Sequence, residues 1–393
     1  MSTINISRRH FLSLLSSVVA GGTLGLPLTG CTHKELLNPD EDILLSGGNY
    51  SEFGTPHKAL IIINPVQKEK RLVQCDFIPH QIIIHPEDKY TVYCFERDGR
   101  NACTINLRTL SVVQKFQCTD DHQFSGHAVF SKDNKFIYTI ESEQQSQQGK
   151  INIRDAATFE SVRLLPTLGL TPHDCQLLQH DIMVVSNTGQ SEPKFHQPSL
   201  VYIDMKTEKL LSRLKLDDDT LNAGHFYVAK DGTLVVASAP VKTAALTTGE
   251  KIITGDTLGG VSIKVADGPV ITMTEPAAVT QRMQGEALAI SINNKKGIAA
   301  VTHPEANLLT FWSISDRQII KAIGIENPRG ITQTLDEKNF VISYGEKPAM
   351  AYIAINGLTP LAETILQPTF ATGEHLLNWS LSLREVMPTR IYG

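Results

Sequence analysis

The sequence has few aromatic residues, no excess of basic charge and no long uninterrupted hydrophobic segment. Aromatic residues make up 6% of the 393 residues, and 36 basic residues stand against 41 acidic ones, a net charge of −5. Nucleic-acid-binding proteins carry basic patches, so this balance argues against nucleic acid as the main partner. The hydrophobic content of 41% is too high for a disordered chain. We therefore expect a folded protein that acts on something other than nucleic acid.

The sequence also lacks the short motifs of several enzyme classes. It contains no Gly-x-Ser-x-Gly, no phosphate-binding Gly-Lys-Ser/Thr, no His-Glu-x-x-His and no Cys-x-x-Cys-His. These absences argue against sites built from one continuous segment. They leave open a site that is assembled from several repeats.

The first 30 residues have the layout of an export signal. Arg8 and Arg9 precede Phe11 and Leu12, and no acidic residue occurs before Cys31. Paired arginines followed by Phe-Leu predict a twin-arginine signal, and the alternative is an ordinary secretory signal with a chance arginine pair. Glycines and a proline interrupt the apolar run, which argues against a permanent transmembrane helix.

The segment that ends at Cys31 resembles a bacterial lipobox. It reads Leu-Thr-Gly-Cys, so we expect residues 1–30 to be removed and Cys31 to carry lipid. The alternative is plain cleavage of a soluble secreted protein. Residues 31–41 are then the lipidated cysteine and a polar tether, and residues 42–393 form one domain. Thr32 follows the cysteine, which favours a periplasmic protein anchored to the outer membrane.

Five further cysteines occur in the chain, an odd number for an oxidising compartment. They are Cys75, Cys94, Cys103, Cys118 and Cys175. Cys94 and Cys103 flank a turn-like Asp98–Asn101 segment and are expected to be neighbours across a hairpin. Whether they form a disulfide or are small buried residues stays open.

The chain has an internal period. Short β-rich runs separated by turn residues dominate, and one unit recurs: a polar residue, usually histidine, and then an apolar strand. The copies begin at His80, His127, His173, His225, Glu286, Arg329 and His375. These positions are 47, 46, 52, 61, 43 and 46 residues apart. A four-stranded propeller blade takes about 40–45 residues, so the period predicts an all-β, seven-bladed β-propeller.

The two ends of the repeat region predict how the ring closes. The last copy has only a first strand, near His375–Leu383, whereas three unassigned strands precede the first copy, at 43–46, 59–64 and 71–76. Three strands from the start and one from the end make the seventh blade. Closure of this kind removes free edges.

The recurring residue of each copy is expected at one mouth of the central channel, since the first strand of a blade lines that channel. Five imidazoles and Glu286 at such a place predict a site for a transition metal such as iron, copper or zinc. Residues i and i+2 of a strand face the same way, so Cys175 is expected to join His173 while Asp174 points elsewhere. Arg329 with protonated histidines would instead suit a carboxylate or phosphate.

A structural interpretation competes with both binding sites. Gly126-His127 and Gly224-His225 resemble the Gly-His pair of WD-repeat propellers, whose histidine helps to hydrogen-bond adjacent strands. Elsewhere, Glu141 and Glu143 end a strand and are expected in a solvated loop.

Several segments together resemble a known family. The order Gly126-His127-Ala-Val-Phe-Ser, Ile137-Tyr-Thr-Ile-Glu-Ser-Glu, Thr171-Pro-His173-Asp and Pro198-Ser-Leu-Val-Tyr-Ile-Asp is similar to the bacterial domain-of-unknown-function 1513 family. The resemblance covers about residues 42–383 and is strongest from Gly126 to Asp204. It implies a twin-arginine-exported propeller that accompanies periplasmic iron-acquisition proteins of the imelysin type, and it assigns no catalytic residue.

We therefore expect an exported, lipid-anchored propeller that binds a metal, a metal complex or a periplasmic protein partner, in the context of iron handling. The alternative is a propeller enzyme, either a lactonase-like hydrolase or a metal-dependent redox protein, with its site at the channel mouth.

Overall fold

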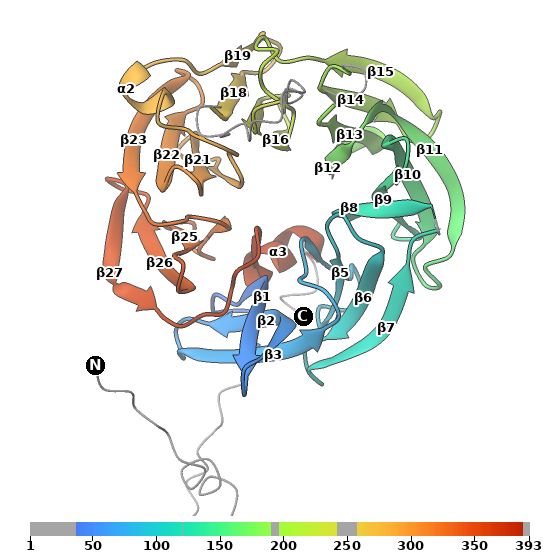
Figure 1. The fold of residues 1–393 in the computed structure, drawn as a ribbon, viewed down its shortest axis with the longest axis horizontal. Helices are drawn as coiled ribbons and strands as arrows, with labels where there is room; N and C mark the ends of the chain where they lie inside the picture. Colours follow the sequence, from blue (N-terminus) through green and yellow to red (C-terminus); the bar gives the residue numbers. More distant parts are fainter. Residues whose placement is uncertain (1–36, 120, 190–195, 242–257, 388–393) are drawn as a thin grey trace, which may run out of the picture. The chain divides into compact units, whose positions relative to one another are not determined.

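The computed structural model describes residues 37–119, 121–189, 196–241 and 258–387. Their strands form seven antiparallel four-stranded sheets, arranged as blades around a central channel (Figure 1). The innermost strands of neighbouring blades contact one another, which places the first strand of each blade at the channel. The predicted all-β, seven-bladed β-propeller is therefore confirmed.

In each of the first three blades the four strands are consecutive in the sequence, and they run in order from the innermost strand to the outermost. Blade one is β4 (Ile82–Ile84), β5 (Thr91–Phe95), β6 (Asn101–Asn106) and β7 (Ser111–Gln117). Blade two is β8 (His122–Phe130), β9 (Phe136–Glu143), β10 (Gln148–Asp155) and β11 (Ser161–Leu170). Blade three is β12 (Pro172–Leu177), β13 (Ile182–Asn187), β14 (Ser199–Asp204) and β15 (Lys209–Leu214), with a 3-10 turn at Gln179–Asp181.

The next three blades repeat the same order. Blade four is β16 (His225–Val228), β17 (Leu234–Ser238), β18 (Gly260–Lys264) and β19 (Val270–Thr272). Helix α2 (Ala277–Thr280) follows, and blade five is β20 (Ile290–Asn293), β21 (Ile298–His303), β22 (Leu308–Ser313) and β23 (Gln318–Gly324). Blade six is β24 (Ile331–Gln333), β25 (Asn339–Tyr344), β26 (Ala349–Ala354) and β27 (Thr359–Leu366).

The seventh blade joins the two ends of the folded chain, as predicted. It consists of β28 (Leu376–Asn378), β1 (Leu44–Glu52), β2 (Thr55–Asn64) and β3 (Glu69–Cys75). The strand β1 pairs with β2 on one side and with β28 on the other, in a register that sets Leu45 opposite Leu377. The ring is thus closed by hydrogen bonds between segments far apart in the sequence.

The last strand is shorter than the predicted His375–Leu383 segment. It ends at Asn378, whose side chain accepts a hydrogen bond from the backbone N–H of Leu381 at 3.2 Å and so caps helix α3 (Trp379–Val386). Trp379 is fully buried, and its indole N–H donates to the Lys89 carbonyl at 2.7 Å. The apolar run after Asn378 is therefore helical and covers the junction of the seventh and first blades.

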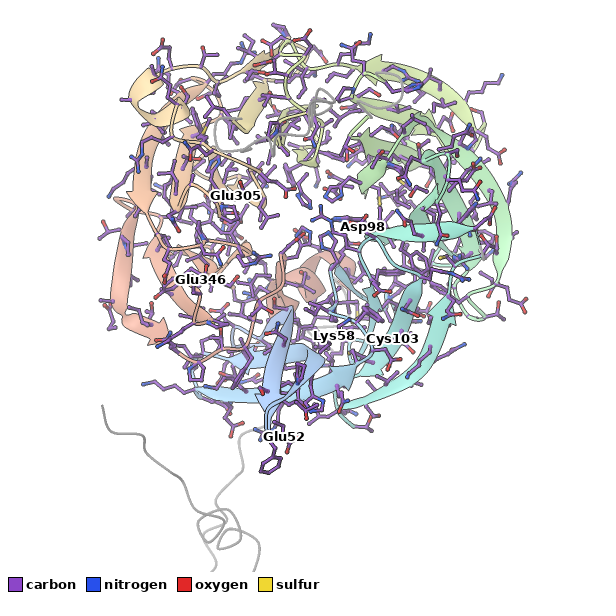
Figure 2. All side chains as sticks on the ribbon, viewed as in Figure 1. Glu52, Lys58, Asp98, Cys103, Glu305 and Glu346 are labelled. Carbon is purple, nitrogen blue, oxygen red and sulfur yellow. The ribbon has the colours of Figure 1, made fainter. Side chains whose placement is uncertain are left out.

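The hydrophobic core is divided among the interfaces between blades. Fully buried Val, Ile, Leu and aromatic side chains come from the middle strands, whereas the outermost strands β7 and β15 are largely exposed. Each aliphatic side chain that is fully buried contributes about 1.5–3 kcal/mol relative to exposure. The side chains fill the blades and reach to the rim of the channel, where Asp98 and Glu305 lie on opposite sides of the opening (Figure 2).

The expected export signal and Cys31 lie outside the described residues, so their roles stay predictions. The described end of the expected tether is not detached, because Leu37 is buried in the core cluster that contains Trp379. Cys94 and Cys103 are cross-strand partners, as the hairpin predicts, and both are free thiols. Among the described residues no helix is long and apolar enough to cross a membrane.

Glu141 does not lie in a solvated loop, contrary to the expectation from the sequence. It lies in β9 and is fully buried. Its carboxylate lies 3.0 Å from His122 Nδ1 and accepts hydrogen bonds from Arg154 Nη2 at 2.7 Å and Thr139 Oγ1 at 2.7 Å. The expectation was wrong because the strand extends through Glu143, which carries Glu141 into the interior of blade two.

Candidate functional site

Five imidazoles meet at the channel. They belong to His80, His127, His173, His225 and His375, which are the five histidines of the predicted ring. Neighbouring ring centroids lie between 4.4 and 6.0 Å apart. We call this group the histidine cluster. The sequence interpretation that placed these residues together is therefore correct in its geometry.

The histidines are brought together because each lies in the innermost strand of its blade or just before it. His225 is the first residue of β16, and His375 immediately precedes β28. Gly126 precedes His127 with a φ of +99°, and a Cβ at this position would overlap Cδ2 of His80. Glycine is thus needed there both for the backbone conformation and for the close approach of the His80 ring.

The ring nitrogens of the cluster face one another at short distances. His80 Nε2 lies 3.0 Å from His127 Nε2 and 3.2 Å from His375 Nε2. A second pair forms between His173 Nε2 and His225 Nε2, also at 3.0 Å. The imidazoles therefore contact each other across the inner strands of different blades.

Two carboxylates contact the outer nitrogens of the cluster. His80 Nδ1 lies 3.3 Å from Glu374 Oε2, and His127 Nδ1 lies 3.0 Å from Asp174 Oδ1, off the ideal direction of a hydrogen bond. A proton on either Nδ1 is attracted by the neighbouring carboxylate, whereas a lone pair on that nitrogen would be repelled by the carboxylate. These contacts therefore favour the tautomer with a bare Nε2.

The cluster is buried, and burial disfavours a charge on four of its five imidazoles. His80, His127, His173 and His225 are between 3% and 7% exposed. Burial, with the neighbouring imidazoles, holds the pKa of His80, His173 and His225 well below its ordinary value. Burial also lowers the pKa of His375 to about 3. Neutral imidazoles are the form that binds metal ions.

Asp174 and Glu374 keep their place through further contacts. Asp174 accepts backbone hydrogen bonds from Cys175 at 2.7 Å and Phe226 at 3.3 Å. Burial opposes ionisation, but the His127 and backbone contacts still hold the pKa of Asp174 below its usual value. Glu374 forms an ion pair with Arg97, and its other oxygen lies 3.7 Å from Arg329.

The two non-histidine members of the predicted ring take different places. Glu286 lies beside the cluster, with a carboxylate oxygen within 4.8 Å of donor nitrogens of His173 and His225. Arg329 contacts the Glu374 carboxylate instead. Arg329 therefore acts on the cluster through a neighbouring charge and is not itself among the candidate donors.

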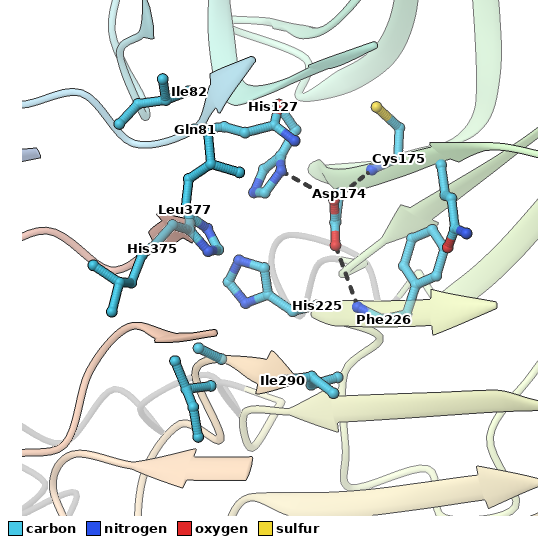
Figure 3. A pocket seen from close by; sticks show the side chains of 14 residues that line it. Gln81, Ile82, His127, Asp174, Cys175, His225, Phe226, Ile290, His375 and Leu377 are labelled. Carbon is cyan, nitrogen blue, oxygen red and sulfur yellow. Dashed lines mark hydrogen bonds and ion pairs between the residues drawn. The ribbon is translucent and has the colours of Figure 1, made fainter. Parts of the chain in front are cut away.

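Cys175 does not join His173 among the donors. A register shift between Pro172 and Cys175 interrupts the alternation of β12, so the i, i+2 rule does not apply there. The thiol packs in a hydrophobic cluster with Ile151 and Val185, and Figure 3 shows its sulfur directed away from the imidazoles. The expectation that Asp174 points elsewhere was wrong for the same reason, since the bulge turns Asp174 toward His127.

Cavities lie on both sides of the cluster. One of about 300 Å³ is lined by His127, His225 and His375 and by apolar residues of the inner strands, such as Ile290 (Figure 3). A second, of about 390 Å³, is lined by His173, Glu286 and Arg97. The histidine cluster thus lies between a cavity inside the channel and a second cavity at the channel mouth.

Three residues of this site escaped sequence reasoning: Asp174, Glu374 and Arg97. Asp174 and Glu374 adjoin histidines of the ring in the sequence, and that adjacency was the available signal. Arg97 lies in the segment after β5 and has no repeat position, so no local pattern identified it.

These features define a class of protein: a seven-bladed β-propeller with a buried histidine cluster across its channel. The chain belongs to the family described as protein of unknown function (DUF1513), whose model matches residues 78–375. The resemblance in the sequence is therefore confirmed. A comparison with curated proteins finds no significant match.

Several solved structures share the fold. Kuenenia stuttgartiensis hydrazine synthase has 11% identity and a TM-score of 0.59, covering 76% of this chain and 92% of that chain. The dihydro-heme d1 dehydrogenase NirN in complex with DHE has 12% identity and a TM-score of 0.56, covering 87% and 76%. A functionally unknown protein from Desulfotomaculum acetoxidans has 9% identity and a TM-score of 0.54, covering 84% and 98%. At these identities the likeness shows the fold alone.

Proposed function

We propose that this protein binds a transition metal ion through the imidazoles of His80, His127, His225 and His375. Donor atoms of these four residues all lie within 4.8 Å of one another. Neutral imidazole nitrogens suit iron, copper and zinc. The four come from blades one, two, four and seven, so the complete ring is needed to assemble the site.

One observation carries the proposal: the Nε2 atoms of His80 and His127 face each other at a short distance. The Nδ1 atoms of His80 and His127 lie next to carboxylates, which leaves their Nε2 lone pairs directed at each other across 3.0 Å. Two lone pairs at this distance repel unless a cation lies between them. A shared proton is disfavoured because burial and the neighbouring imidazoles lower the pKa of His80. A metal ion relieves the repulsion.

Two of the distances between these nitrogens match those of ligands around one ion. Nitrogens bound at about 2.0–2.1 Å lie about 2.9 Å apart at an angle of 90° and about 3.3 Å apart at a tetrahedral angle. The observed separations of 3.0 Å between His80 and His127 and 3.2 Å between His80 and His375 fall in this range. Asp174 and Glu374 then orient the ligands from outside, as carboxylates do at many histidine metal sites.

We also propose that the protein acts outside the cytoplasm, held to a membrane through lipid on Cys31, and that it takes part in iron handling with a periplasmic protein partner. The twin arginines Arg8 and Arg9 and the lipobox-like segment support the location. Replacing Arg8 and Arg9 by lysine would then retain the protein in the cytoplasm. Cys31→Ser would release it from the membrane fraction.

Metal content after removal and reloading tests the binding site. We expect the purified full chain, stripped with a chelator and exposed in turn to Fe²⁺, Cu²⁺ and Zn²⁺, to retain one of them tightly after gel filtration. His127→Ala should abolish retention, and Asp174→Asn should weaken affinity by about 10–100-fold.

His85→Ala is the matched control, because His85 lies outside the cluster and its Nδ1 accepts hydrogen bonds from its own loop. It should bind metal as the wild type does. If the wild type retains none of the three ions, or if His127→Ala retains as much as the wild type, the proposal fails.

A further inference from the structure

The Glu286 carboxylate is a half-buried acid without a direct partner. Among the described residues it makes neither a hydrogen bond nor an ion pair, and Arg97 and Arg329 influence it only from a longer distance. Burial raises the pKa of Glu286, as expected for a carboxylate that is short of favourable contacts. A half-buried carboxylate is costly unless something compensates its charge, and a cation would do so.

His225 connects this carboxylate to the four-histidine site. Its Nε2 lies 3.0 Å from His173 Nε2, while its Nδ1 is buried without a hydrogen-bond partner among the described residues. Donor atoms of His173, His225 and Glu286 all lie within 4.8 Å of one another, and His225 also belongs to the group with His80, His127 and His375. One imidazole is therefore common to two sets of candidate ligands.

The two sets face different spaces. His173 and Glu286 line the polar cavity of about 390 Å³ at the channel mouth, together with Arg97 and Asn222. His225 lines the cavity of about 300 Å³ on the other side, as His127 and His375 do. A path from the mouth thus meets Glu286 and His173 first, then His225, and then the remaining histidines.

We propose that His173, His225 and Glu286 form a second, open metal position, from which an ion passes by way of His225 to the four-histidine position. This inference rests on the proposed function. Two imidazoles and one carboxylate leave coordination positions free for water or for a small anionic ligand that arrives with the ion. The Arg97 guanidinium at the cavity wall favours such an anion.

The chemistry of the two positions gives the transfer its direction. The open position offers an anionic oxygen, which attracts a hydrated cation and replaces part of its water shell. The four-histidine position offers only imidazole nitrogens, so borderline ions such as Cu²⁺ and Zn²⁺ are held there more tightly than by the mixed set. His225 lets the ion exchange ligands stepwise without returning to solvent.

Stopped-flow mixing of the metal-free full chain with Co²⁺ tests the inference, since the visible absorption of Co²⁺ reports its ligands and geometry. The wild type should show a fast phase of weak absorption and a slower phase of strong absorption. Glu286→Gln should lose the fast phase and load at least ten-fold more slowly, with the same final spectrum. His80→Ala should keep the fast phase and lose the slow one.

Glu305→Gln is the matched control, because Glu305 is an exposed acid that acts on Glu286 only through its charge. It should load with nearly the rates of the wild type. Equal rates and spectra for Glu286→Gln and the wild type would overturn the inference and leave the four-histidine site intact. A wild type that binds no Co²⁺, Fe²⁺, Cu²⁺ or Zn²⁺ would overturn the proposed function itself. Circular dichroism of every variant separates loss of a ligand from loss of the fold.

Discussion

The buried Glu141 of blade two should be essential for stability, although it lies outside the candidate site. Its carboxylate accepts hydrogen bonds from Arg154 Nη2, Thr139 Oγ1 and Asn152 Nδ2, the last at 3.1 Å, and it contacts His122. Glu141→Gln keeps the shape but removes the charge. Arg154, which is only 3% exposed, would then be a buried cation without its counter-ion.

The expected cost follows from this burial. Removing one partner of a buried ion pair destabilises a protein by about 3–5 kcal/mol, because the remaining charge stays away from water. Whole domains are stable by about 5–15 kcal/mol, so the change is a large fraction of the total. Replacing both charges, in Glu141→Leu with Arg154→Met, should cost less than Glu141→Gln alone, since no charge is left buried.

The effect should also depend on pH in a defined direction. The His122 and Arg154 contacts outweigh the burial penalty and hold the pKa of Glu141 below its usual value, so its contribution is lost as pH falls through that lowered pKa. The hydrogen bond from Glu141 raises the pKa of His122, so the His122 contribution is lost as pH rises through that raised pKa. The network therefore contributes most to stability between about pH 4.5 and 6.5, where Glu141 and His122 are both charged in the folded and in the unfolded state.

Urea unfolding followed by circular dichroism, at pH 5.5 and at pH 8.5, measures these differences. Glu143→Gln is the control, because Glu143 is a neighbouring acid whose ion pair with Lys150, at 2.8 Å, lies nearer the surface. The reasoning is refuted if the free energy of unfolding of Glu141→Gln lies within about 1 kcal/mol of that of the wild type. It is also refuted if the double replacement is less stable than Glu141→Gln. In either case buried charge does not explain the stability of blade two.

Two further predictions concern the histidine cluster. Gly126→Ala should weaken metal affinity by at least ten-fold in a chelator competition, because the new Cβ would displace the His80 ring. Gly297→Ala is the control, because Gly297 also has a positive φ but no neighbour within 4 Å, and it should leave the affinity unchanged. Equal affinities for the two variants would contradict the role of Gly126. The ion that the wild type retains should stabilise the fold by about 2.7 kcal/mol at a free concentration 100 times its Kd. The measurement is a rise in the urea midpoint of unfolding that a chelator reverses. An unchanged midpoint would show that the ion does not bind the native state preferentially.

Much of this architecture was available in the sequence alone. The blades follow from local alternation of apolar strands and turns, and a repeated residue at the start of each unit must recur at the same place in each blade. That logic placed His80, His127, His173, His225 and His375 at one channel, and it joined the terminal strands in the seventh blade. These features depend on period and order, which a linear sequence displays directly.

Other features depended on the direction in which individual side chains point in the folded structure. The bulge in β12 exchanges the expected roles of Asp174 and Cys175, because one extra residue reverses the alternation of a strand. The apolar segment after Asn378 is compatible with a strand or with a buried helix. Its packing against the first blade, as helix α3, is seen only in the folded structure.

The electrostatics of the site were decided by the tertiary structure as well. Glu374 and Arg97 are separated by 277 residues, and nothing in the sequence links them, yet their ion pair lies beside His80 and helps to set its tautomer. Glu141 likewise lies near the end of a strand in the sequence, and only the folded blade shows that it is buried with Arg154 and His122 as its partners. The sequence determined the fold and the list of candidate ligands by itself, since repetition and hydrophobic pattern are local. The partners of these ligands and their grouping into the two proposed metal positions depend on distances between blades, which only the closed ring defines.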